Sequence, residues 1–202
     1  MDHNDWIIKQ RESIARLVKP DWHFADIGAC RGEILGTLCS LMEEGYAFEA
    51  NPSNYAGLMQ YFAGQKVVIN PQAISNREGD ITFYYGKSAE EGSLLGHDMN
   101  FTPMTSSSTI QCTTMDNYFK DKRVDFIKLD VEGAEWDVFE GAQELLKRDI
   151  LWQVEFHLNE DWHKREILFE NDYNIFDLDF NKLEKDSPRP YLAFLSKKDS
   201  LI

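Results

Sequence analysis

The chain alternates short apolar runs with segments whose apolar residues recur at helical spacing. This rhythm predicts βαβ units, in which helices connect and cover the strands of a mostly parallel sheet. Five runs are nearly continuous in apolar residues, which is typical of strands buried on both faces. They comprise residues 23–29, 46–50, 66–70, 124–131 and 152–158. Two later runs, residues 175–178 and 191–195, predict an antiparallel pair that closes the sheet.

Helices are predicted between these strands, over residues 34–42, 54–62 and 134–147. The second follows Pro52, a residue type that favours the first turn of a helix. The third has Lys147 and Arg148 at its C-terminal end, where the helix dipole favours cations. Helices placed in this way between parallel strands cover both faces of the sheet.

The segment after the third strand has a different pattern. Residues 80–86 alternate apolar and polar side chains, which predicts one further, half-buried strand. Residues 87–108 are polar and contain glycines, a proline and three consecutive serines. We expect a long loop there, which is either a lid over a functional site or a plain connector.

Length and composition indicate how many domains the chain can form and in which cellular compartment we expect it. A chain of 202 residues with 43% hydrophobic content suits a single α/β domain over residues 1–202. No apolar run approaches the roughly 20 residues of a membrane span. The polar, acidic start does not resemble a signal peptide, so we expect a cytoplasmic protein. Cys30, Cys39 and Cys112 are too scattered for a disulfide framework and are expected to be reduced.

The net charge limits the classes of molecule that we expect the protein to bind. The formal net charge is −14 and no basic stripe is visible along the sequence. Nucleic-acid binding depends on basic side chains that neutralise phosphates, so nucleic acid is excluded as an expected partner. A neutral small molecule or a glycan is the partner class that such a surface accepts.

The first candidate site is a glycine loop at the end of the first strand. Residues 24–32 run from apolar strand through Asp26, Gly28 and Gly32 into a helix, and Glu49 follows the next strand. Glycines let a ligand approach the backbone, and the helix N-terminus supplies N–H groups. An acidic residue about 20 positions further on is where a ribose diol finds its acceptor. Together they predict a nucleotide-type site.

The charge of this loop favours one ligand. A dinucleotide site typically has three glycines spaced as G-x-G-x-x-G, whereas here Gly28 and Gly32 stand four apart. The carboxylate of Asp26 repels a pyrophosphate but suits the ammonium group of a bound amino acid. S-adenosylmethionine (SAM) is therefore favoured over NAD. The alternative is that Asp26 only caps the loop.

A second group of carboxylates follows the fourth strand. Asp130 and Glu132 come at the carboxyl end of this strand, and Gly133 turns the chain into the next helix. Ligands of open α/β sheets bind at this edge, so these residues are expected beside Asp26. Glu135 is interpreted instead as a helix N-terminal acid that complements the dipole.

The third group is Glu155 and His157, which share one face at the end of the fifth strand. Beside Asp130 they predict either a catalytic base or an oxygen and nitrogen metal site. The alternative for His157 is a purely structural role at the strand end.

Several segments together resemble the FkbM family of SAM-dependent methyltransferases. They are Asp-Ile-Gly-Ala at 26–29, Ala-Phe-Glu-Ala-Asn-Pro at 47–52 and Lys-Leu-Asp-Val-Glu-Gly-Ala-Glu at 128–135. Shorter matches lie at 72–75, 92–94 and 114–118. The resemblance implies a class I, Rossmann-like fold with a mostly parallel seven-stranded sheet. It also implies O-methylation of hydroxyl groups, commonly on sugars, glycolipids or polyketide-derived rings. Among these, a deoxysugar such as rhamnose or fucose is our preferred acceptor.

The resemblance also implies roles for individual residues. Asp26 and the loop would bind the methionine part of SAM, Glu49 with Ala50 the ribose, and Gln72 with Ala73 the adenine. Ser93 and Asp130 would face the reacting centre. The loop residues assigned to cofactor binding are Gly28, Ala29, Cys30 and Gly32. Cys30-Arg31 departs from the family's usual residues, and only about 20 residues precede the first strand, so we expect a short capping segment or none.

These residues give a mechanistic hypothesis. His157 or Glu132 is the base that takes the hydroxyl proton, while Asp130 and Glu155 orient the hydroxyl or bind a divalent cation, Mg²⁺ or Mn²⁺. Two alternatives remain: an NAD(P)-dependent oxidoreductase on the same sheet, and a non-catalytic module that only binds a partner. The convergence of carboxylates speaks against the second alternative.

Overall fold

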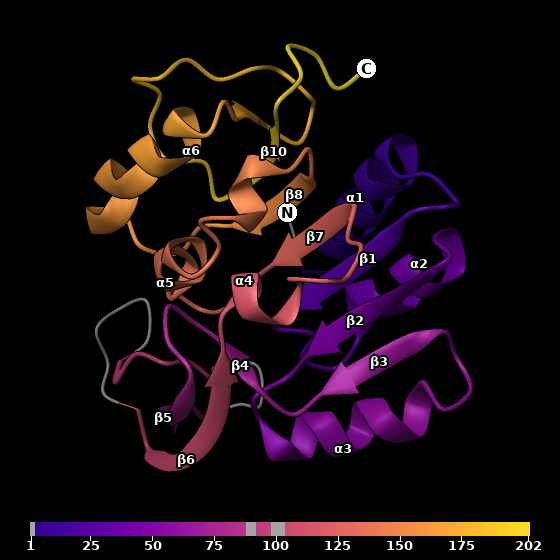
Figure 1. Cartoon of the computed structure of the whole chain (residues 1–202), viewed down its shortest axis with the longest axis vertical. Helices are drawn as coiled ribbons and strands as arrows, with labels where there is room; N and C mark the ends of the chain where they lie inside the picture. The colour runs from indigo at the N-terminus through magenta and orange to yellow at the C-terminus, as the bar shows by residue number, and fades with distance from the viewer. Residues whose placement is uncertain (1–2, 88–91, 98–103) are drawn as a thin grey trace.

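The computed structural model describes residues 3–87, 92–97 and 104–202. Its centre is a seven-stranded sheet with the strand order β3-β2-β1-β7-β8-β10-β9 (Figure 1). β1 (His23–Ile27), β2 (Glu44–Phe48), β3 (Val67–Asn70), β7 (Phe126–Leu129) and β8 (Leu151–Glu155) are parallel. β10 (Leu192–Ser196) is antiparallel to β8 and to β9 (Asn174–Phe176). The predicted fold class, including the antiparallel closing pair, is confirmed.

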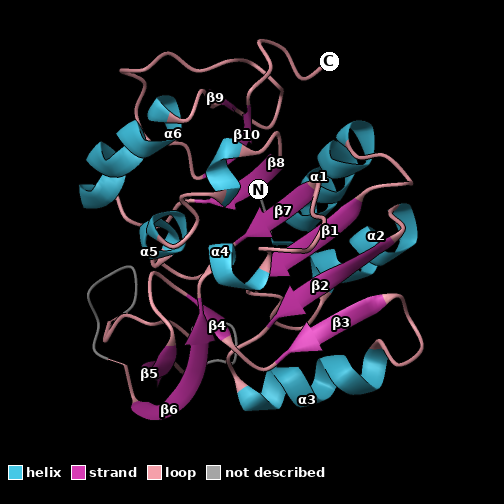
Figure 2. Cartoon of the chain, viewed as in Figure 1, coloured by secondary structure: helices cyan, strands magenta, loops and turns pink. Residues whose placement is uncertain are grey.

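Helices cover both faces of this sheet (Figure 2). One face carries α1 (His3–Leu17), α2 (Glu33–Leu41) and α3 (Pro52–Tyr61). The other carries α4 (Met115–Tyr118), α5 (Glu135–Glu140), the 3-10 turn η1 (Leu145–Lys147) and α6 (Glu166–Glu170), which follows the 3-10 turn η2 (Glu160–Arg165). Within the described residues, no helix is long and apolar enough to cross a membrane.

A second sheet of three strands stands beside β3 and α5, in the order β4-β6-β5. It consists of β4 (Ala73–Ile74), β5 (Gly79–Tyr85) and β6 (Ser106–Thr113). The strand predicted at 80–86 is confirmed as β5. The loop predicted at 87–108 lies partly outside the described residues, and the prediction is wrong at its end, because the three serines begin β6 and pair with β5. Serine is a weak strand former, and only this pairing places it in a sheet.

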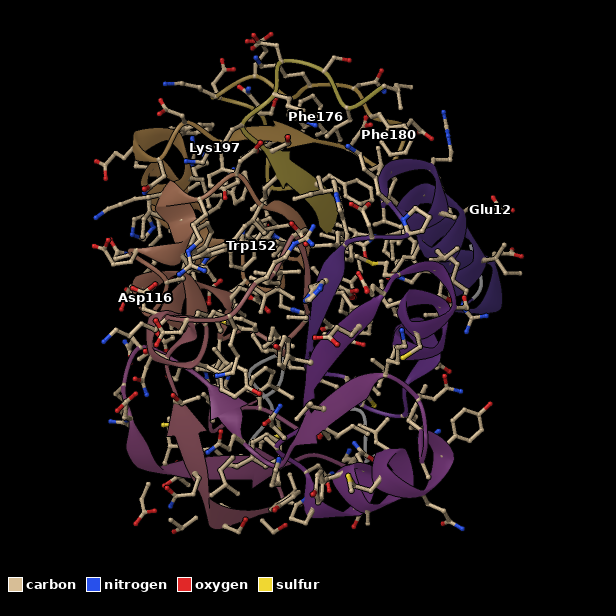
Figure 3. All side chains as sticks on the ribbon, turned by 45° about the vertical axis from the view of Figure 1, so that its right-hand side comes forward. Glu12, Asp116, Trp152, Phe176, Phe180 and Lys197 are labelled. Atoms are coloured by element: carbon tan, nitrogen blue, oxygen red, sulfur yellow. The ribbon has the colours of Figure 1, made fainter. Side chains whose placement is uncertain are left out.

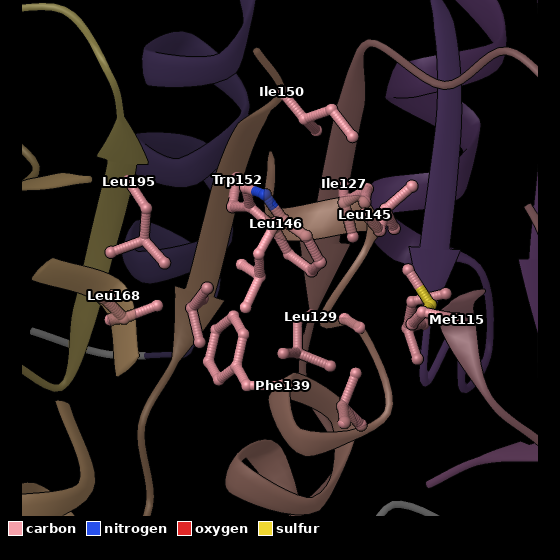
Figure 4. Packing of buried hydrophobic residues seen from close by; sticks show 14 of the residues in the cluster. Met115, Ile127, Leu129, Phe139, Leu145, Leu146, Ile150, Trp152, Leu168 and Leu195 are labelled. Carbon is pink, nitrogen blue, oxygen red and sulfur yellow. The ribbon is translucent and has the colours of Figure 1, made fainter. Parts of the chain in front are cut away.

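The core lies on both faces of the central sheet. Side chains alternate along β1, so that Ala25 and Ile27 join the cluster under α5 while Phe24 joins the cluster under α1 and α2. Figure 4 shows the first cluster, in which Trp152 packs against Leu146 and Phe139. Trp152 also lies centrally among the side chains in Figure 3. This packing fixes the strand ends from which the functional side chains project.

The helix predictions need two corrections: one predicted helix is divided, and one helix was not predicted. The helix predicted at 134–147 is divided: α5 ends at Glu140, and η1 follows after a turn that begins at Gly141. Gly141 lies against the carbonyl group of Ser75, and this contact leaves no room for a side chain. The long helix α1 was not predicted, although Ile14 is fully buried and Trp6 and Ile7 pack with it.

Candidate active site

A buried polar row crosses three neighbouring strands on the face under α1. Asp26 of β1 is in register with Lys128 of β7, which is in register with Gln153 of β8. All three are buried. The Lys128 ammonium lies 3.0 Å from the carbonyl oxygen of Gly28, 3.1 Å from Asp130 Oδ2 and 3.6 Å from Asp26 Oδ1. Sequence reasoning missed Lys128, although a lysine inside an apolar strand was a signal.

Asp26 is almost fully enclosed, with 1% of its surface exposed. Burial raises its pKa, and the neighbouring Lys128 ammonium opposes that shift. Neither carboxylate oxygen of Asp26 has a hydrogen-bond partner among the described residues. A buried carboxylate without hydrogen bonds is costly, so a ligand that donates to it gains a strong interaction. The interpretation of Asp26 as a loop cap finds no hydrogen bond in the described structure to support it.

The glycine loop brings β1 and β7 together. Gly28 has a φ of +78°, and a Cβ there would overlap the carbonyl oxygen of Asp130. Cys30 also has a positive φ, of +49°, and Gly32 at +84° opens α2. The left-handed turns direct the loop under the end of β2, where the N–H groups of Gly28 and Ala29 donate to the carbonyl oxygen of Phe48.

Glu49 is held rigidly by two backbone groups. Its Oε2 accepts a hydrogen bond from the Cys30 N–H at 2.7 Å and its Oε1 accepts one from the Asn51 N–H at 2.8 Å. Burial raises the pKa of Glu49 to about 7, and these N–H groups limit the rise. The Asn54 side chain also donates to this carboxylate, and a carboxylate has about four acceptor positions, so one remains for a further donor. Cys30, where the loop departs from the family's usual residues, therefore binds Glu49 through its backbone N–H. Any residue that tolerates this φ would make the same hydrogen bond.

A tight turn presents Glu132. Glu132 and Gly133 have φ values of +54° and +101°, and they lead from β7 into α5. Ser93 Oγ donates to the carbonyl oxygen of Glu132 at 2.7 Å and accepts from the Leu95 N–H at 3.1 Å. Ser93 is itself fixed by backbone pairing with Tyr84 of β5. The second sheet therefore positions the turn that carries Glu132.

His157 lies at the centre of the acidic group. Its Nδ1 is 2.7 Å from Glu135 Oε1, which also accepts the Gly133 N–H at 2.9 Å. Its Nε2 lies 3.8 Å from Asp130 Oδ1, 3.6 Å from Glu132 Oε2 and 3.8 Å from Glu155 Oε1. Glu135 thus does more than the expected helix N-terminal acid, because its buried carboxylate orients His157.

The acid groups and the imidazole shift one another's pKa. Burial lowers the pKa of His157, but the hydrogen bond that its Nδ1 donates to Glu135 and the surrounding carboxylates outweigh burial and raise the value to about 9. Burial and the charge of Asp130 raise the pKa of Glu132 and of Glu155 to about 7. The structure therefore concentrates negative charge at the carboxyl ends of β7 and β8, as the sequence predicted.

These groups face one cavity of about 550 Å³, a size typical of small-molecule sites. Most of the residues predicted to bind the cofactor line it: Asp26, Gly28, Ala29, Cys30, Glu49, Ala50, Ala73, Ser93 and Asp130. Glu132 and Glu155 line it as well. Gly32, Gln72 and His157 are outside the lining; Gly32 packs against Phe62, and His157 lies behind the carboxylates.

An aromatic wall closes one side of the cavity. Trp6 of α1 lies 5.5 Å from Tyr191, measured between ring centroids, and Tyr191 lies 5.8 Å from the ring of His157. Both Trp6 and Tyr191 line the cavity, together with Ile7. The segment before β1, expected to be a short cap or none, forms the 15-residue helix α1, which covers this part of the site. Neither aromatic residue was predicted as a site residue.

A doubly covered sheet in this strand order, with its cavity at the carboxyl ends of the parallel strands, defines a Rossmann-like class I architecture. The family model for the methyltransferase FkbM domain matches residues 26–181. The chain therefore belongs to the FkbM methyltransferase family, as its sequence segments indicated. The predicted membership of this family of SAM-dependent methyltransferases is thereby confirmed.

Solved structures agree with this fold. A methyltransferase FkbM from Methylobacillus flagellatus KT matches 89% of this chain and 44% of its own, with a TM-score of 0.60 and 17% identity. The chain therefore spans less than half of that relative. A SAM-dependent O-methyltransferase from Thermotoga maritima matches 94% of this chain and 64% of its own, with a TM-score of 0.54 and 15% identity.

A Streptococcus mutans protein, solved in complex with SAH, matches 94% of this chain and 96% of its own. Its TM-score is 0.53 and its identity 8%. At such identities the likeness shows the shared fold. No protein of curated function matches the sequence.

Proposed function

We propose that the cavity binds SAM at the β1–β2 side and an acceptor hydroxyl at the β7–β8 side, and that the protein methylates this hydroxyl. The acceptor is a neutral sugar in a glycan or glycoconjugate. The observation that carries the proposal is that Glu132 lines the same cavity as Asp26 and Glu49. One cavity thus holds cofactor-type carboxylates and a separate carboxylate that suits proton transfer.

The residues at the β1–β2 side fit the cofactor. Asp26 offers two buried carboxylate oxygens without hydrogen-bond partners among the described residues, which suits the ammonium group of the methionine part. Glu49 keeps an acceptor position for a ribose hydroxyl, while two backbone N–H groups and the Asn54 side chain hold its carboxylate in place. The SAH complex of the Streptococcus mutans relative supports this choice of ligand.

The base is assigned from geometry. Bound SAM supplies an electrophilic methyl group, so this chain must align the acceptor oxygen and remove its proton. Glu132 lines the cavity, and 35% of its side chain is exposed. The side chain of His157 is 1% exposed and its Nδ1 is engaged by Glu135. We therefore assign the proton transfer to Glu132, and we assign His157 the role of holding the carboxylates in position.

The acceptor class follows from the aromatic wall and the charge. Trp6 and Tyr191 present ring surface beside the carboxylates, and such amphipathic rings combine apolar contact with hydrogen bonding. A net charge of −14 disfavours a phosphorylated or nucleic-acid acceptor. A sugar offers an apolar ring face and neutral hydroxyl groups, and a deoxysugar such as rhamnose or fucose offers the larger apolar face.

The direct test is incubation of the protein with isotope-labelled SAM and a panel of glycans, followed by mass spectrometry of the products. We expect a label in the O-methyl group of a sugar. Glu132→Gln should lower kcat by about 10²-fold or more, as loss of a general base does. Glu144→Gln, a change at an exposed acid, is the matched control and should keep full activity. Methylation of a nitrogen, or equal turnover by Glu132→Gln, would contradict the proposal.

A further inference from the structure

We propose that Asp130, Glu155 and His157 together bind one divalent cation of the Mn²⁺ type beside the acceptor hydroxyl. The inference rests on the proposed function, because it gives the acceptor side of that cavity a metal. One ligand atom from each of the three residues lies within 4.8 Å of the other two. The three residues come from the carboxyl ends of two adjacent parallel strands, β7 and β8.

The distances within this group suit a shared cation better than direct contact. His157 Nε2 lies 3.8 Å from Asp130 Oδ1 and 3.8 Å from Glu155 Oε1. Both separations exceed hydrogen-bonding distance. Two atoms that each bind one cation at about 2.2 Å lie roughly 3.1–3.6 Å apart at right or tetrahedral angles. A shift of a few tenths of an ångström would therefore bring His157 Nε2 and either of these carboxylate oxygens to the separation of two ligands on one cation.

His157 is oriented as metal-binding histidines are. Its Nδ1 is 2.7 Å from the buried carboxylate of Glu135, and Glu135 is fixed in turn by the Gly133 N–H. A carboxylate that accepts the proton of one ring nitrogen directs the other nitrogen at the metal, and binding of the cation displaces the proton from that second nitrogen. Nε2 accordingly faces the carboxylates of Asp130 and Glu155.

An unpartnered carboxylate oxygen and an excess of negative charge also favour a cation at this place. Asp130 Oδ1 is buried and has no hydrogen-bond partner among the described residues, while Lys128 binds only the other oxygen, Oδ2. Five carboxylates surround the two basic groups Lys128 and His157: Asp26, Asp130, Glu132, Glu135 and Glu155. A divalent cation neutralises part of this excess at the place where the carboxylates converge.

The donor set selects the class of ion. Carboxylate oxygens suit Mg²⁺, Ca²⁺ and Mn²⁺, whereas imidazole suits later transition metals, and Mn²⁺ accepts both donor types. A cation in this position can coordinate the acceptor hydroxyl and lower its pKa, as metals do for bound water. Glu132, whose Oε2 lies 3.6 Å from His157 Nε2, is then adjacent to the hydroxyl proton.

The test is a titration of the EDTA-treated full chain with Mn²⁺, followed by electron paramagnetic resonance of the free ion. We expect one site per chain, and a 10-fold or larger loss of affinity in Glu155→Gln and in Glu135→Gln. Glu144→Gln should bind like the wild type. No binding at millimolar Mn²⁺, or equal binding by Glu155→Gln and the wild type, would overturn the proposal.

A parallel calorimetric titration of the metal-free protein with SAH separates this inference from the proposed function. SAH binding without Mn²⁺ binding refutes the cation site and leaves the cofactor site standing. SAH binding by Glu155→Gln and Glu135→Gln also shows that these variants are folded. Failure of the wild-type protein to bind SAH would count against the proposed function instead.

Discussion

The ammonium group of Lys128 lies 3.1 Å from Oδ2 of Asp130. The same group lies 3.6 Å from Asp26, so one buried lysine connects the glycine loop of β1 with the acidic turn after β7. The attraction of both carboxylates outweighs burial and raises the pKa of Lys128, which keeps the ammonium charged. Two parts of the cavity are therefore held in fixed relation by one buried residue, Lys128, which itself lines the cavity.

The first prediction concerns stability. Lys128→Met should destabilise the fold by about 3 kcal/mol, because it leaves the buried Asp26 without its countercharge. Urea-induced unfolding monitored by tryptophan fluorescence measures the change. The control is Lys147→Met, since Lys147 forms an exposed pair with Glu144 and its loss should cost less than about 1 kcal/mol. Equal costs for both variants would contradict the role of Lys128.

The coupling of Lys128 to Asp26 can be measured separately. In the double variant Lys128→Met/Asp26→Asn no buried charge of this pair remains, so the combined cost should be smaller than the sum of the single costs. We expect a coupling free energy of about 1 kcal/mol or more from the double-mutant cycle. Strict additivity of the two substitutions would show that the pair does not interact in the folded protein.

The second prediction concerns the glycine loop. Gly28→Ala should destabilise the protein by several kcal/mol and abolish SAH binding, because the new Cβ would overlap the Asp130 carbonyl at a φ of +78°. Gly57→Ala is the matched control: Gly57 lies in α3, and a Cβ added there would meet no described atom within 4 Å. That change should be neutral or stabilise by up to about 1 kcal/mol. Thermal unfolding of both variants makes the comparison.

The third prediction concerns pH. Burial raises the pKa of Glu49 to about 7, so the carboxyl is protonated below that pH in the free protein. If its carboxylate receives the ribose hydroxyls, SAH affinity should increase as the pH rises from about 6 to about 8. Calorimetry at several pH values measures this slope. Glu49→Gln should bind SAH more weakly and lose the part of the slope that belongs to Glu49.

The same shift predicts a trend in stability. The folded state binds a proton on Glu49 between its ordinary pKa of 4.5 and about 7, whereas the unfolded state does not. The contribution of this group to stability is therefore fully present below pH 4.5 and is lost as the pH rises through about 7. Glu49→Gln should make the free energy of unfolding less dependent on pH across this window, as measured by urea unfolding.

The fourth prediction concerns the aromatic wall. Trp6→Ala should raise KM for the sugar acceptor about 10-fold while leaving SAH affinity unchanged, because Trp6 contacts Tyr191, whose ring lies beside His157. Ile8→Ala is the control in the same helix, since Ile8 is 52% exposed and does not line the cavity. An equal effect of Trp6→Ala on SAH affinity would place the aromatic wall in the cofactor site instead.

The sequence predicted the central sheet because its strands carry continuous apolar runs, and β1, β7 and β8 lie where those runs are. It failed for elements whose structure depends on distant partners. Ser106 and the two serines after it are strand residues only because β5 pairs with them. α5 ends at Glu140 because the following glycine packs on the chain near Ser75, a contact that no local pattern reveals.

The residues of the candidate site also divide into those that the sequence predicts and those that depend on distant partners. Asp26, Glu49 and Asp130 could be predicted, because strand ends and glycine turns mark their positions in the sequence. Lys128 was hidden in an apolar run, and Trp6 in a helix that the acidic start of the chain did not suggest. Tyr191 comes from the far end of the chain and reaches the cavity only through the antiparallel position of β10. Such residues become visible only when the strands are placed side by side.

The central claim is that this cavity is the cofactor site of a SAM-dependent methyltransferase. Calorimetric titration of the full chain with SAH, with NAD⁺ as the competing nucleotide, tests it most directly. We predict one SAH site per chain, no NAD⁺ binding, and at least a roughly 10-fold loss of SAH affinity in Asp26→Asn. SAH binding that is unaffected by Asp26→Asn, or binding of NAD⁺ in preference to SAH, would contradict it.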